Sequence, residues 1–187
     1  MKIILASASP RRKNLMDVLG LEFEIKVSDC EEIIDKNQSV ENIVMSLSSQ
    51  KARAVAKETP KGYVVIGADT VVSYGNEILG KPRDIDDAIR MLCLLSGKTH
   101  SVYTGFTIIN TNDNSIITDY EKTDVTFKKL TEKEIIDYIS FNNPMDKAGA
   151  YSIQGIASSF VKKIDGDYNN VVGLPLFKLS KYLYGII

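Results

Sequence analysis

The stretch LASASPRRKNL near the start of the chain places two arginines and several hydroxyl side chains where an apolar run gives way to an amphipathic one. Ser7 and Ser9 can donate hydroxyls, while Arg11 and Arg12 can bind phosphate oxygens through their guanidinium groups. If Ser9 caps a helix that begins at the next residue, a proline, the unpaired N–H groups of that helix also attract an anion. Cations in a first helical turn cost about 0.3–1 kcal/mol unless negative charge offsets them. The stretch therefore predicts an anion site, and the alternative is a capped surface helix with solvated arginines.

Two charged residues interrupt apolar patterns, and a third is presented by a loop. Lys51 falls on the apolar stripe of a predicted helix, so its ammonium must either reach solvent or find an anion. Asp69 interrupts the apolar run 64–72, where a carboxylate must be paired, protonated or bound to metal. A buried ion pair with a lysine is the structural alternative for Asp69. Lys81, in Gly-Lys-Pro, is a cation held by a loop and means little alone.

The segment NNPMDKAGAYSIQG places Gln154 among small residues that allow close backbone approach. Its amide both donates and accepts, which suits the edge of a base, although a turn amide would look the same. His100 is the only histidine, which excludes His-pair and Cys/His metal sites and makes a histidine relay improbable. We expect it to be a strand residue satisfied by a neighbour. Cations and carboxylates without a strong nucleophile suit a metal and a polyphosphate under attack by water.

These residues need a mixed scaffold of strands and helices. The periodicity predicts an α/β protein with a mixed sheet, flanking helices and one domain over residues 1–187. Strands are expected at 2–6, 22–27, 63–72, 99–109, 115–127 and 160–164. Helices are expected after the caps Ser9, Ser39, Asp84 and Thr131 and after Pro175, and a hairpin turn is expected at 74–77. The second helix is expected to bury Val40, Val44, Leu47, Lys51, Ala54 and Val55.

Composition excludes several classes of function. The formal net charge of −1 gives no basic surface for nonspecific nucleic-acid binding. No apolar run approaches the roughly 20 residues that cross a bilayer, and no signal peptide is recognised, so no membrane partner is expected. Only Cys30 and Cys93 are present, which together with these absences predicts a reduced, cytoplasmic protein.

Seven motifs in order carry a family resemblance: LASASPRR, SQKA, GADTVV, GKP, LSGKTHSVYTG, DKAGAYSIQG and GDYNNVVGLPL. They resemble those of the Maf family of nucleoside triphosphate pyrophosphatases over nearly the whole chain. The resemblance implies an elongated mixed sheet with a cleft between two lobes, like that of inosine triphosphatases. It also implies a homodimer that hydrolyses a nucleoside triphosphate to the monophosphate and pyrophosphate with a divalent metal, Mg²⁺ or Mn²⁺.

The motifs also imply residue roles. Asp69 corresponds to the family's proton acceptor, and Arg12, Thr70 and Gln154 to the specificity positions of its dTTP/UTP branch. Glu32 corresponds to the acidic partner of Asp69 at the metal, with Glu31 as the alternative. The implied substrate-binding set is Ser7, Arg11, Arg12, Lys51, Thr70, Lys81 and Gln154.

The sequence departs from the family pattern in two places. Cys30 and Glu31 stand where the family has an aspartate-rich DxDE, and Asn142-Asn143 replaces a usual Gly-Glu, which removes any role of that acid here. An alternative function is an interaction or regulatory protein of cell division, in which the nucleotide site is a sensor or a relic. A site with both Asp69 and Glu32 near cations favours the enzyme.

Overall fold

The structure, a computed structural model, describes residues 1–27, 31–35 and 37–186. The chain divides into two compact units. The first unit comprises Met1–Thr70, Thr104–Glu121 and Gly173–Ile187, and the second comprises Val71–Tyr103 and Lys122–Val172. The prediction of a single domain with two lobes around one cleft stays a prediction.

The described residues form a seven-stranded mixed sheet with helices beside it, which confirms the predicted α/β class. The strands are β1 (Lys2–Leu5), β2 (Phe23–Ile25), β3 (Tyr63–Tyr74), β4 (Glu77–Leu79), β5 (Thr99–Asn110), β6 (Ile116–Phe127) and β7 (Val161–Asp165). The helices are α1 (Pro10–Val18), α2 (Val40–Lys57), α3 (Ile85–Leu95), α4 (Glu132–Phe141), α5 (Tyr168–Val172) and α6 (Leu176–Leu183), with 3₁₀ turns η1 (Ala148–Ala150) and η2 (Gly155–Phe160). The sequence did not predict α5, η1 or η2, which are three to six residues long and too short to show a period.

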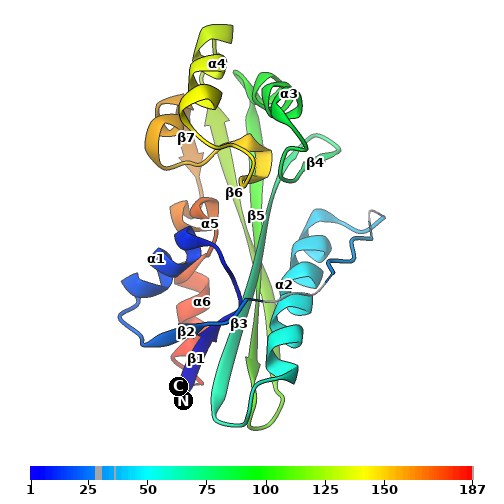
Figure 1. Cartoon of the computed structure of the whole chain (residues 1–187), viewed down its shortest axis with the longest axis vertical. Coiled ribbons are helices and arrows are strands. Elements are labelled where there is room, and N and C mark those ends of the chain that lie inside the picture. Colours follow the sequence, from blue (N-terminus) through cyan, green and yellow to red (C-terminus); the bar gives the residue numbers. More distant parts are fainter. Residues whose placement is uncertain (28–30, 36, 187) are drawn as a thin grey trace. The chain divides into compact units, whose positions relative to one another are not determined.

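The sheet has the strand order β2-β1-β3-β5-β6-β7, with β4 paired to β3. Strand β1 runs parallel to both β2 and β3, whereas β4 and β7 run antiparallel to their partners. The predicted hairpin turn lies between β3 and β4. In the first unit, Figure 1 shows α2 on one side of β3 and helices α1 and α6 on the other.

The four helix starts for which the sequence predicted a capping side chain are capped as expected. Ser9, Ser39, Asp84 and Thr131 each accept a hydrogen bond from the backbone N–H three residues later. Glu134 completes the capping box at Thr131 by accepting from the backbone N–H of that residue. These local signals were readable because a cap depends only on residues within one turn.

Helix α2 packs closely against β3 and β5 because both strands place a glycine beneath it. A Cβ atom on Gly67 would lie 2.5 Å from the carbonyl oxygen of Ser48, and one on Gly105 would lie 2.3 Å from that of Val44. The face of α2 turned to the sheet is therefore Ile43, Val44, Leu47, Ser48, Ala52 and Val55. The predicted burial of Val40 and Ala54 was wrong, since both are only half-buried. The face that α2 turns to the sheet depends on where its small residues meet the glycines of the strands. The apolar stripe of the helix alone does not show this.

The second unit has an aromatic core around His100. Its ring stands edge-on to Phe127 and Tyr151, with centroids 4.8 Å and 5.4 Å away. The Nε2 atom of His100 forms a 2.8 Å hydrogen bond with the hydroxyl of Tyr151, as expected for a satisfied strand histidine. Its Nδ1 atom is buried without a partner among the described residues. No helix in the described part of the chain is long and apolar enough to cross a membrane.

Candidate active site

The candidate site forms where β1 ends and β3 continues. Leu5, the last residue of β1, pairs with Ile66 in parallel register, and β3 extends eight residues further to Tyr74. Beyond that point β3 carries Asp69 and Thr70, whose side chains point to opposite faces because side chains alternate along a strand. Helix α1 begins just after β1, so its N-terminus lies at the carboxyl end of a parallel pair, where ligands of α/β sheets bind.

Glu32, Lys51 and Asp69 form a charged cluster on the α2 side of β3. The ammonium of Lys51 donates a hydrogen bond to Oδ1 of Asp69 and lies 3.0 Å from Oε1 of Glu32. Lys51 and Asp69 side chains are only 17% and 13% exposed, and Glu32 is 43% exposed. Lys51 therefore binds anionic partners rather than extending into solvent. For Asp69, the predicted alternative of an ion pair with a lysine is the arrangement in this structure.

Gln50, the neighbour of Lys51 on α2, holds the loop that carries Glu32. Its side-chain oxygen accepts from the backbone N–H of Ile33, and its Nε2 donates to the carbonyl of Ile33, both at 2.9 Å. This reciprocal pair fixes the loop next to Glu32, the residue that pairs with Lys51. The structure thus brings Glu32 rather than Glu31 to Lys51. Asp29 and Cys30, the other residues of the acidic loop, lie outside the described residues.

Arg12 lies at the centre of a second group, the arginine network, on the α1 side of β3. Its Nε donates to the carbonyl of Gly173 at 2.8 Å, and its two terminal nitrogens donate to Thr70 Oγ1 at 3.0 Å and Ser7 Oγ at 3.3 Å. The hydroxyl of Thr70 also bonds to that of buried Thr104 at 2.9 Å. Burial lowers the pKa of the Arg12 guanidinium, and the charge of Asp69 opposes that shift. The alternative of a solvated Arg12 therefore does not hold in this structure.

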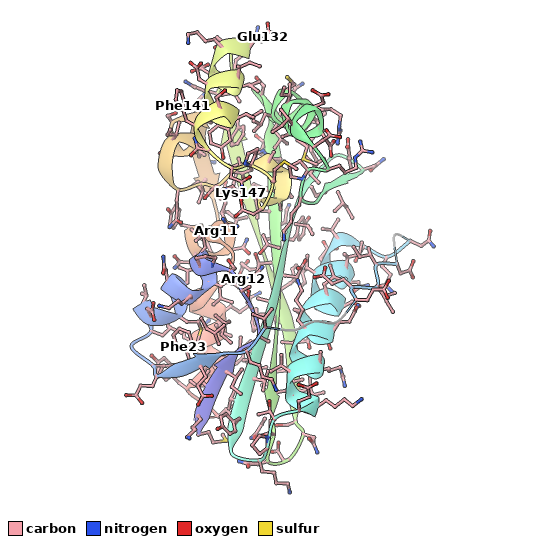
Figure 2. All side chains as sticks on the ribbon, in the orientation of Figure 1. Arg11, Arg12, Phe23, Glu132, Phe141 and Lys147 are labelled. Carbon is pink, nitrogen blue, oxygen red and sulfur yellow. The ribbon has the colours of Figure 1, made fainter. Side chains whose placement is uncertain are left out.

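The start of α1 keeps the features of an anion site. Ser9 accepts from the backbone N–H of Arg12, and Ser7 Oγ accepts from the backbone N–H of Ser9. The first turn contains no acidic residue to offset its arginines. Figure 2 labels Arg11 and Arg12 at the beginning of α1, with Arg12 on the side facing β3. The helix dipole and both arginines thus favour a negatively charged ligand here.

Two predicted site residues, Lys81 and Gln154, belong to the second unit. Both side chains are exposed. The segment that contains Gln154 is hydrogen-bonded to the segment that contains Lys81. The backbone N–H of Gly149 donates to the carbonyl of Gly80 at 3.0 Å. In the same unit Lys147 pairs with Asp146 at 2.6 Å. Within this unit, Lys81 and Gln154 are therefore accessible to a ligand.

The charged cluster fits Mg²⁺ or Mn²⁺ by its donor set. Mg²⁺ in proteins is commonly held by one or two carboxylates together with substrate phosphates and water. Glu32 and Asp69 supply two such carboxylates, already turned toward one cation. Among residues 1–27, 31–35 and 37–186, no group of three or more His, Cys, Asp or Glu is placed to hold a metal ion.

A surface hollow of about 930 Å³ also lies in the first unit, lined by residues of β1, α1 and β2 and the segment between α1 and β2. It includes Lys13, Asp17 and Phe23 but none of the predicted site residues. Its size alone assigns no function, because none of the residues expected to bind the nucleotide or metal lines it.

Gln50, Thr104 and Gly173 are site residues that the sequence reading missed. Gln50 and Gly173 lie inside the quoted motifs SQKA and GDYNNVVGLPL, and Thr104 lies inside LSGKTHSVYTG, so a signal existed but no role could be attached to it. Gly173 accepts through its backbone carbonyl, and because every residue has this group, its role cannot be predicted from residue type.

Together, the fold and these side chains define an α/β protein with a site of mixed charge that can hold an anion and a cation side by side. The family model described as Maf-like protein matches residues 2–186. The chain therefore belongs to the Maf family.

Curated relatives match almost the whole chain. Proteins named dTTP/UTP pyrophosphatase from Alkaliphilus oremlandii (strain OhILAs) and Bacillus cereus (strain G9842) are each 54% identical over 182 residues, which is 97% of this chain and 94% of theirs. Among solved structures, the Staphylococcus aureus Ham1 protein matches 68% of this chain and 72% of its own at 13% identity and a TM-score of 0.47. That likeness is too weak to support a fold assignment.

Proposed function

We propose that this protein hydrolyses dTTP and UTP to the corresponding monophosphate and pyrophosphate. Membership of the Maf family and the names of relatives 54% identical over nearly the whole chain support this substrate class. The structural observation that carries the proposal is the pairing of Asp69 and Glu32 around the ammonium of Lys51, where the charges of both carboxylates act on Arg12 of α1. Hydrolysis of a phosphoanhydride requires a general base and positive charge near the phosphates. Here a carboxylate can act as the base, and the ammonium of Lys51 supplies positive charge.

Asp69 is the proton acceptor in this proposal. Its carboxylate takes a proton from the attacking water, and the hydrogen bond from Lys51 orients the carboxylate before substrate arrives. Glu32 and Asp69 would hold the divalent metal, which when bound neutralises phosphate charge and polarises the phosphorus centre under attack. Because phosphoryl transfer needs positioning and charge neutralisation more than covalent help, no nucleophilic side chain is required.

Positive groups bind the triphosphate. The N–H groups at the start of α1, the hydroxyl of Ser7 and the side chains of Arg11, Lys51 and Lys81 contact phosphate oxygens. A guanidinium has five N–H donors, so Arg12 retains donors for a substrate oxygen after bonding to its three protein partners. Arg12 is thus already oriented when the nucleotide binds.

Arg12, Thr70 and Gln154 set the base preference. The amide of Gln154 pairs with the O4 and N3–H edge that thymine and uracil share, whereas cytosine presents a donor in place of O4. A mismatched base leaves a polar group unpaired at a cost of about 1–3 kcal/mol. The proposal therefore places dTTP and UTP ahead of CTP, ATP and GTP.

Pyrophosphate release from these five nucleotides, each with and without Mg²⁺ or Mn²⁺, tests the proposal. Metal-dependent release that is fastest from dTTP and UTP supports it. Binding of nucleotide with no turnover under any condition would contradict it and favour a nucleotide-sensing regulatory protein. The implied homodimer and cytoplasmic location remain predictions, which light scattering and cell fractionation test.

A further inference from the structure

Two carboxylates share one ammonium in the charged cluster. Asp69 and Glu32 come from different segments, strand β3 and the loop before α2, yet both contact Nζ of Lys51. Like charges brought this close repel unless a cation lies between them. Lys51 supplies that cation, and Gln50 holds the loop so that Glu32 stays within reach. The protein thus stabilises its carboxylate pair with its own side chain.

The same carboxylate oxygens are the donors that fit a divalent cation. A group that binds them must therefore compete with the ammonium of Lys51. Since Lys51 and Asp69 are both mostly buried, water screens their attraction only weakly, and the competition is stronger than at a surface ion pair. A carboxylate pair without Lys51 would be open to a cation at all times.

A triphosphate offers Lys51 a different anionic partner. Arg12, at the start of α1, lies near the cluster, since the charges of both Asp69 and Glu32 act on its guanidinium. Phosphates attracted to the start of α1 therefore approach the ammonium of Lys51. The flexible stem of a lysine lets its charge move between partners without a shift of the backbone.

We propose that Lys51 is a resident cation which occupies the carboxylates of Asp69 and Glu32 in the free protein and transfers to the phosphates of the incoming nucleotide, so that metal and nucleotide bind cooperatively. This inference rests on the proposed function, because it uses a triphosphate as the ligand. Metal without nucleotide binds weakly, which restricts the assembled site to the substrate complex.

Mn²⁺ binding without nucleotide tests the first half of the proposal, by calorimetry or by the spin-resonance signal of free Mn²⁺. Lys51→Met keeps the length of the stem and removes the charge, and we expect it to bind Mn²⁺ at least ~10-fold more tightly than wild type, which corresponds to about 1.4 kcal/mol. Lys51→Arg retains a cation, so its Mn²⁺ binding should stay as weak as that of wild type. Lys133→Met, which breaks an exposed ion pair with Asp137, is the matched control and should equal wild type. If Lys51→Met does not fold, Lys51→Gln replaces it.

The second half is tested with a dTTP analogue whose α–β bridge is a methylene group and cannot be cleaved. In wild type the analogue should tighten Mn²⁺ binding at least ~10-fold, and in Lys51→Met this coupling should be largely lost. Lys51→Met binding Mn²⁺ no more tightly than wild type would overturn the proposal, as would equal coupling in both proteins. These are binding measurements, so they stay distinct from the proposed function, which fails if triphosphates are bound but not hydrolysed.

Discussion

Gly67→Ala tests whether the close approach of α2 to β3 sets the geometry of the charged cluster. Gly67 and Asp69 are two residues apart on β3, so both face α2, the helix that carries Lys51. The added Cβ would lie 2.5 Å from the carbonyl oxygen of Ser48 and 2.7 Å from the backbone nitrogen of Ala52. Ordinary contact requires about 3.5 Å, so α2 must move outward by about 1 Å. Both obstructing atoms belong to backbone, which cannot rotate away.

The expected cost has two parts. Overpacking of this kind destabilises a protein by about 1–3 kcal/mol, which urea unfolding measures. A displacement of about 1 Å at catalytic groups can cost about 100-fold in rate, which pyrophosphate release from dTTP measures. Gly185→Ala is the control, because its nearest contact would be an ordinary 3.5 Å. If Gly67→Ala kept both wild-type stability and wild-type kcat, the close approach would not position the cluster.

Three other predictions concern single side chains. Asp69→Asn should lower turnover at least ~100-fold at saturating metal while the protein still folds, and retention of more than a tenth of wild-type turnover would remove Asp69 from its role as base. Gln154→Ala should flatten the ranking of nucleotides by kcat/KM more than it lowers kcat on dTTP; an unchanged ranking would rule out base reading by Gln154. Burial lowers the pKa of His100 to about 4. Because the unfolded chain takes up that proton near pH 6.5 and the folded chain does not, stability should fall by up to about 3 kcal/mol between pH 6.5 and pH 4. Urea unfolding of wild type and His100→Phe across this range measures the effect, and an identical pH dependence in the two proteins would refute it.

The sequence predicted those elements whose signals are local. Caps at Ser9, Ser39, Asp84 and Thr131, the hairpin after β3 and the long apolar strands all depend on neighbours within a few residues. The face of α2 was less well predicted, because it depends on glycines in two strands distant in the sequence. Short elements such as α5 had no period to detect.

The site was predictable in its residue types but not in its contacts. Unusual charge placement singled out Lys51 and Asp69, but whether they met each other or a ligand could not be decided, because the pairing spans 18 positions and two elements. The hydrogen bond from Arg12 to Gly173 spans 161 positions and ends on a backbone carbonyl, which leaves no trace in residue type. Thr104 was missed because a buried threonine in a strand is ordinary until its partner is known.

The most direct test of the central claim is to identify the products that the wild-type protein forms from dTTP with Mg²⁺. Phosphorus NMR can monitor this reaction. Hydrolysis between the α and β phosphates should yield dTMP and pyrophosphate in equal amounts, and Asp69→Asn should yield neither at a comparable rate. Formation of dTDP and inorganic phosphate would contradict the account, as would an Asp69→Asn protein that forms dTMP as fast as wild type.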